Sequence, residues 1–156
     1  LLWLWLSKRG AEPNSIIKFG LGFLGLALAF AIFYSTIFFA SPDGMTSLEI
    51  FTLAYFVITF GELCLSPIGL SLMTKLSPRP IQGLMMGMWF LASAYGQYVA
   101  GLLGAGMSTA DPNATPLMKL TAYTLGYKQL AIYALACGIV MIAISPLIKK
   151  LMRGVN

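Results

Sequence analysis

The sequence has no histidine and only two cysteines, and charged residues make up 10% of its 156 residues. It contains no cluster of Cys, Asp and Glu at ligand spacing, so neither a metal site nor any other cofactor is expected. It also lacks a Walker loop and a dinucleotide fingerprint, and we expect no enzyme activity. The ten Lys and Arg exceed the five acids, but they are scattered over short links and form no continuous patch for nucleic acid.

Long apolar runs occupy most of the chain, and 58% of its residues are hydrophobic. A soluble domain carries roughly 25% charged residues, so this composition indicates an integral membrane protein. About 20 apolar residues are enough for a helix to cross a bilayer. The sequence therefore predicts an all-α membrane fold. We expect the end of a helix at 1–6 and complete spans at about 16–40, 48–74, 81–107 and 120–148.

The cations of the links indicate the orientation of the spans. One side of the predicted membrane carries eight of them, Lys8, Arg9, Lys18, Lys75, Arg79, Lys149, Lys150 and Arg153, and the other side carries only Lys119 and Lys128. By the positive-inside rule the side with eight cations is cytoplasmic, and so is the C-terminus. We expect Lys18 to anchor its helix at the interface. The long side chain of Lys128 either extends outward toward water, which we favour, or pairs across the bundle.

Glu62 is the one acidic residue deep inside an apolar run, which extends from about Leu48 to Thr74. At a rise of ~1.5 Å per residue this run exceeds a hydrocarbon core of ~30 Å, so Glu62 is expected near the midplane. A charged side chain there costs roughly 2.5–3.5 kcal/mol and normally faces a partner or a water-filled cavity. Glu62 is therefore the first candidate for a binding residue.

Ser66 and Pro67 follow Glu62 in the same predicted helix. Ser66 lies one turn later on the same face, so its hydroxyl and the Glu62 carboxylate can point at one ligand. Pro67 has no N–H for the carbonyl of Leu63, and together with Gly69 it predicts a kink that we interpret as a hinge. In the alternative interpretation, Ser66 bonds only its own backbone and Glu62 pairs with another helix to fix packing.

The run at 81–107 has no charged residue but carries a deep tryptophan, Trp89. Trp89 is expected ~12 Å inside the helix, too deep for the interfacial aromatic belt. It either fills the bundle or lines a cavity, where it offers an apolar wall and one N–H donor. On antiparallel neighbours the depths of Trp89 and Glu62 would differ by only ~4–5 Å, so they are predicted to line one cavity. Secondary candidates on the same helix are Ser93, Tyr95, Gln97 and Tyr98.

Small residues recur at about every fourth position of the same run and predict the close approach of another helix. They are Gly83, Gly87, Ala92, Gly96, Ala100 and Gly104.

The stretch at 61–101, GELCLSPIGLSLMTKLSPRPIQGLMMGMWFLASAYGQYVAG, resembles the proton-coupled oligopeptide transporters. These form the peptide-transporting branch of the major facilitator superfamily. The run ELxxSPxGLSLxTKLxP followed by GxMMGxWFL carries most of the resemblance, and KFGLGFLGLALAF and WLSKRG fit the same placement. The resemblance implies twelve helices in two six-helix bundles. This chain would then be the C-terminal part, from the end of the eighth helix through the twelfth.

The resemblance also implies a function and a site. Members of this family bind di- and tripeptides between the bundles and carry them inward with protons. The glutamate of the tenth helix, here Glu62, would help to bind the peptide amino terminus and would pair with a lysine of the N-terminal bundle. Ser66 lies beside it, and the tryptophan of the eleventh helix, here Trp89, would line a side-chain pocket. The ExxER motif of the first helix is absent from this chain, so proton coupling follows from the resemblance alone.

The sequence thus predicts part of a secondary active symporter of the cell inner membrane. Its expected partners are di- and tripeptides, protons, the lipid bilayer and the remaining helices of the same transporter. The alternative from a different class is a small membrane scaffold or channel-like subunit in which Glu62 forms a structural ion pair between helices.

Overall fold

The structure of the chain, a computed structural model, describes residues 9–10, 13–107 and 113–151. In chain order its elements are α2 (Ser15–Ser35), the 3-10 helix η1 (Thr36–Phe39), α3 (Leu48–Leu76), the 3-10 helix η2 (Arg79–Ile81), α4 (Gln82–Met107) and α5 (Pro116–Leu151). No strand is found among the described residues, so the predicted all-α class is confirmed. The helix end expected at 1–6 lies outside the described residues.

Some helix boundaries differ from the expected ones for local reasons. The run expected at 16–40 is α-helical only to Ser35 and continues as η1. The last helix begins at Pro116, four residues earlier than expected. The fixed φ of proline suits the first helical turn, and the Thr115 hydroxyl accepts a hydrogen bond from the Met118 backbone N–H at 3.3 Å.

Three of the described helical segments are long and apolar enough to cross a membrane, namely Ser15–Phe39, Leu48–Leu76 and Pro116–Ile148. The helix α4, which we expected to be a full span, is not among them. It is 26 residues long and carries no charged residue, and its crossing of the membrane stays a prediction.

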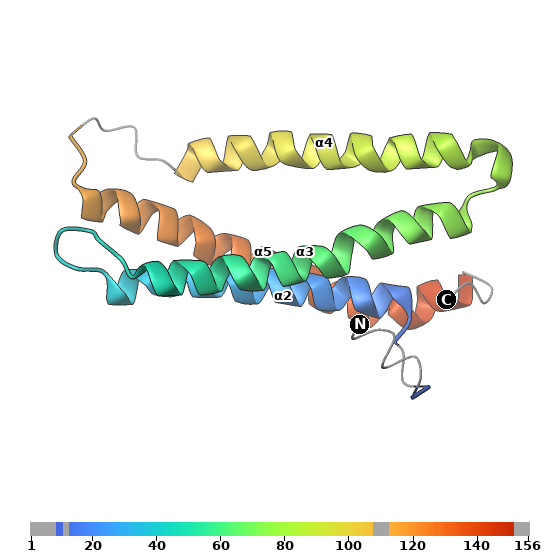
Figure 1. Cartoon of the computed structure of the whole chain (residues 1–156), viewed down its shortest axis with the longest axis horizontal. Helices are drawn as coiled ribbons and strands as arrows, with labels where there is room; N and C mark the ends of the chain where they lie inside the picture. The colour runs from blue at the N-terminus through green and yellow to red at the C-terminus, as the bar shows by residue number, and fades with distance from the viewer. Residues whose placement is uncertain (1–8, 11–12, 108–112, 152–156) are drawn as a thin grey trace.

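The helix α2 packs against both α3 and α5 along much of its length (Figure 1). Glycines lie at both crossings. A Cβ on Gly25 would lie 3.3 Å from the Gly61 Cα of α3, and one on Gly20 would lie 3.2 Å from the Gly138 carbonyl oxygen of α5. Backbones this close leave no room for larger side chains, and such contacts replace the hydrophobic drive that lipid does not supply. The glycines of α2 therefore build the centre of the described bundle.

The row of small residues on α4 does not make such a contact within the described chain. A Cβ on Gly83, Gly87, Gly96 or Gly104 would meet no atom of the described residues within 4 Å. Among the described residues close helix approach is found on α2, and for α4 it stays a prediction.

Two lysines within the helices contact neighbouring helices. Lys18 is only 9% exposed, because α2 lies between two helices and its first turn is covered by them. Lys128 of α5 places its Nζ 5.6 Å from the centre of the Tyr34 ring on α2, a cation–π distance. Its side chain therefore contacts a neighbouring helix, which agrees with the second of the two expected placements and leaves its outward extension a prediction.

The helix α4 is joined to the other helices near its two ends. At its start the Gln82 side-chain amide donates to the Thr74 carbonyl at 2.7 Å. At its end Met107 covers Gly126 of α5, where a Cβ would lie 2.8 Å from the Met107 sulfur. Between these ends its residues are mostly exposed, and the ribbon stands apart from the other three helices (Figure 1).

Candidate functional site

Glu62 and Ser66 lie on α3, and both side chains are exposed. They are four residues apart in a continuous helix, so they share one face. Within the part of the chain that the structure describes, no side chain pairs with the Glu62 carboxylate. One turn before them, the Thr59 hydroxyl donates to the Tyr55 carbonyl at 2.9 Å. Glu62 and Ser66 are therefore the polar groups of this face that are open to a ligand.

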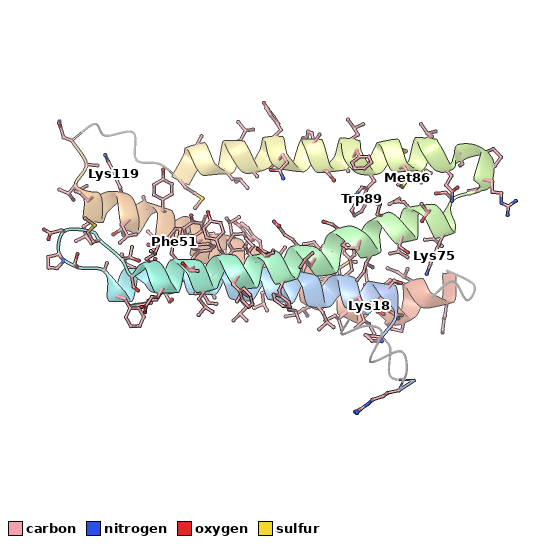
Figure 2. The ribbon with its side chains drawn as sticks, in the orientation of Figure 1. Lys18, Phe51, Lys75, Met86, Trp89 and Lys119 are labelled. Carbon is pink, nitrogen blue, oxygen red and sulfur yellow. The ribbon has the colours of Figure 1, made fainter. Side chains whose placement is uncertain are left out.

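Trp89 reaches from α4 across to α3 and α2 (Figure 2). Its six-membered ring lies directly on Gly69, where an added Cβ would be 2.6 Å from Trp89 Cζ2. It also meets the Phe19 ring of α2 edge-on, with the ring centres 6.4 Å apart and the planes at 78°. The tryptophan is half-buried and holds the first part of α4 against the bundle.

An apolar cavity of about 260 Å³ lies beside Trp89. Its lining comes from all four α-helices and includes Phe19 of α2, Gly69 and Leu72 of α3, and Met141 of α5. Of the two interpretations left open by the sequence, the contacts place Trp89 at a cavity wall. Phe19 and Met141 were missed by sequence reasoning, because nothing in an apolar helix distinguishes them from lipid-facing residues.

The depths of Glu62 and of the Trp89 ring along α3 differ by more than the predicted ~4–5 Å. Gly69, which contacts Trp89, follows Glu62 by seven residues on the same face, or ~10 Å along the helix axis. Side chains of a helix lean toward its N-terminus, so Trp89 leans toward the Gln82 end of α4 and away from Glu62. The bond between Gln82 and Thr74 sets this register.

The secondary candidates on α4 do not join this site within the described chain. The Ser93 hydroxyl donates to the Trp89 carbonyl at 3.0 Å, so it serves its own helix. Tyr95 and Tyr98 are 69% and 64% exposed, because no described helix covers the middle of α4.

Pro67, the expected hinge residue, lies inside the unbroken helix α3. In Figure 1 the axis of α3 bends, and its C-terminal part approaches α4. A proline inside a helix is an established cause of such a bend, since it removes one hydrogen bond and crowds the carbonyl four residues earlier. A role of Pro67 and Gly69 in movement stays a prediction.

Two chemically different binding features lie along one face of α3, a pair of polar side chains and an apolar cavity. The carboxylate of Glu62 and the hydroxyl of Ser66 can accept hydrogen bonds from a cationic amino group. Two helical turns away, the cavity at Trp89 can enclose an apolar group. A small molecule with both features fits this face.

The sequence matches the POT family (PTR2) over residues 2–123. It is 34% identical over 156 residues to the peptide transporter YePEPT of Yersinia enterocolitica, covering 97% of this chain and 29% of that protein. It is 32% identical over 155 residues to the di-/tripeptide transporter of Lactococcus lactis, covering 99% of this chain and 29% of that protein.

Solved structures are similar as well. A bacterial homologue of the human drug peptide transporters PepT1 and PepT2 matches with a TM-score of 0.73 and 32% identity, over 96% of this chain and 31% of that one. A structure from work on substrate recognition in proton dependent oligopeptide transporters matches with a TM-score of 0.73 and 31% identity, over 96% of this chain and 32% of that one.

The chain spans less than a third of the length of the relatives that it matches. The likeness confirms the predicted fold class, an all-α membrane protein whose helices match part of the fold of these transporters. It also confirms that the chain has transporters, and not enzymes, as its relatives. The family match covers well over half of the sequence, and the chain belongs to the POT family.

Proposed function

We propose that the protein containing this chain is a secondary active symporter that carries di- and tripeptides inward together with protons. In this proposal the chain supplies one wall of the central peptide site. The observation that supports it best is the exposed Glu62–Ser66 pair on α3. The same face of α3 carries Gly69, which contacts Trp89 of α4 and lines the cavity.

The spacing of the two groups suits a short peptide. Glu62 binds the amino terminus, assisted by Ser66, and the cavity at Trp89 receives an apolar side chain. An extended chain spans ~3.3–3.6 Å per residue, so three residues reach ~10 Å. This equals the ~10 Å between Glu62 and Gly69 along α3, whereas a longer peptide would exceed it.

The orientation of the protein follows from its cations. The protein lies in the cell inner membrane, with the side that carries eight of the ten cations, and the C-terminus, in the cytoplasm. No cofactor takes part, and the proton is the coupling ion.

Uptake by the full-length protein in sealed vesicles tests the function. With a labelled dipeptide outside and an inward proton gradient, we expect saturable accumulation above the outside concentration. A protonophore should abolish the accumulation but leave saturable equilibration in place. Vesicles without the protein are the control. Absence of saturable uptake with and without the gradient would contradict the proposal and favour a structural ion pair at Glu62.

A further inference from the structure

We infer that Gly69 is a positioning residue whose missing side chain seats Trp89 on α3 and thereby sets the size of peptide side chain that the cavity accepts. The inference rests on the proposed peptide transport and adds a determinant of side-chain selectivity to it.

The contact between Gly69 and Trp89 leaves no space for a methyl group. A Cβ at residue 69 would lie 2.6 Å from both Cζ2 and Cζ3 of the indole, closer than carbon atoms approach in a packed interior. Gly69 itself is buried on the α3 face that meets α4. An added methyl group must therefore displace the indole ring.

The displaced ring moves one wall of the cavity. Phe19 bounds the indole edge-on from α2, and both rings together with Gly69 line the same apolar cavity of about 260 Å³. A shift of the indole off Gly69 therefore changes the room that the cavity offers to a guest. The size of residue 69 thus controls the free volume through Trp89.

The backbone of Gly69 does not require glycine. Positive φ is found among the described glycines only at Gly10 and Gly44, so Gly69 has the ordinary helical conformation that any residue adopts. Pro67 already supplies a cause for the bend of α3. What is specific to Gly69 is the space that its missing side chain provides.

Four variants of the full-length transporter distinguish packing of Trp89 on Gly69 from bending of α3. They are Gly69→Ala, Pro67→Ala, Trp89→Leu and the double variant Gly69→Ala/Trp89→Leu. For each, the affinities of Ala-Ala and Ala-Phe are measured by competition against a labelled dipeptide. We expect Gly69→Ala to weaken Ala-Phe about tenfold more than Ala-Ala, as overpacking of a tight contact would. Pro67→Ala, the hinge control, should leave the ratio of the two affinities unchanged.

The double variant provides the decisive comparison. Because leucine lacks the ring that meets residue 69, the selectivity ratio of the double variant should equal that of Trp89→Leu alone. An unchanged ratio in Gly69→Ala, or a Gly69→Ala effect of full size in the Trp89→Leu background, would overturn the inference. Failure of the proposed function itself would be visible separately, as absence of uptake by the wild type.

If Gly69→Ala does not reach the membrane, the amount of protein there becomes the readout. Recovery of the wild-type amount in the double variant supports the packing of Trp89 on Gly69, since the clash between the two residues is then the cause of the defect. A double variant that stays as poorly delivered as Gly69→Ala overturns it.

Discussion

Polar side chains within the helices differ in whether the backbone of their own helix can form hydrogen bonds with them. The hydroxyls of Thr52, Thr59 and Thr121 each donate to the carbonyl four residues earlier, at 2.8–2.9 Å. Such bonds satisfy a hydroxyl inside a single helix. An ionised carboxylate only accepts hydrogen bonds, and the N–H groups in the middle of a helix are already used, so Glu62 needs a partner other than the backbone of its own helix.

Replacement of Glu62 tests whether this partner is a peptide amino group. Glu62→Gln keeps the shape of the side chain and removes its charge, so the charge-assisted bond is lost. We expect the wild type to bind a dipeptide at least tenfold more tightly than its N-acetylated form, and the variant to bind the two within about twofold. Competition against a labelled dipeptide measures both. A variant that discriminates as strongly as the wild type would show that Glu62 has a structural role.

Ser66→Ala is the matched control for Glu62→Gln, because it removes a neutral group from the same face one turn away. It should weaken the dipeptide less than Glu62→Gln does and keep most of the preference over the N-acetylated form, because the charge of Glu62 stays in place.

The elements differ in how they are held together. The helix α2 is fixed along its length by glycine contacts to α3 and α5, while α4 is held near its ends by Trp89 and Met107. A polar contact also joins α2 to α5, because the Asn14 side-chain amide donates to the Ser145 hydroxyl at 2.8 Å. The elements thus combine a tightly packed three-helix unit with a fourth helix that touches it at two places.

Asn14 has two functions at the start of α2, and its substitution should reveal both. Its Oδ1 accepts from the Ile17 backbone N–H at 2.8 Å as the helix cap, and its amide bonds Ser145, which is 1% exposed. Loss of a cap costs about 1 kcal/mol, and a buried hydroxyl without a partner costs a further 1–3 kcal/mol. We expect Asn14→Ala to lower the melting temperature of the full-length protein measurably.

The comparison variants for Asn14 separate cap from bridge. Ser145→Ala keeps the cap and removes the buried hydroxyl together with the bridge. Only the side-chain amide of Asn14 then loses a partner, so the effect should be smaller than that of Asn14→Ala. Asn14→Ser keeps a capping oxygen and should fall between wild type and Asn14→Ala. Equal melting temperatures for Asn14→Ala and wild type would contradict the role of this contact.

Pro67 is expected to ease bending of α3 during transport. Alternating access involves rocking of bundles, and a helix bends most easily where a backbone bond is already missing. Pro67→Ala restores that bond and should slow turnover several-fold while peptide affinity changes less than twofold. Uptake rates at matched expression, together with competition affinities, check this. Equal turnover in both proteins would leave the bend as a packing feature.

At the scale of the whole molecule, the relatives of this chain are longer than the described bundle. The chain spans less than a third of its relatives, and in its described part α4 has no buried residue. Peptide sites of such carriers lie near the midplane at the interface between repeats. In the proposed function, the face with Glu62 and the cavity at Trp89 would form one wall of the peptide site, and other segments of the transporter would form the opposite one.

The isolated chain should accordingly bind no peptide. In detergent or lipid, we expect no saturable binding of a labelled dipeptide at concentrations where the full-length protein is saturated. Circular dichroism is the control for helix content. Saturable binding by the isolated segment, competed by unlabelled dipeptide, would contradict the assignment of this chain to a single wall.

The sequence by itself determined the membrane class, the approximate helices and the Glu62–Ser66 pair. These features depend on hydropathy and on the helical period, which are local in the chain, so Glu62 and Ser66 share a face in any α-helix. The same holds for Pro67, whose missing N–H acts within one helix.

Only the tertiary structure decided which helices approach closely and what Trp89 contacts. Both α4 and α2 are rich in small residues, yet between these two helices only those of α2 meet a neighbouring backbone among the described residues. Gly69 and Trp89 belong to different helices, and their contact depends on the register between α3 and α4. No periodicity encodes that register, because it results from the joint packing of all the helices.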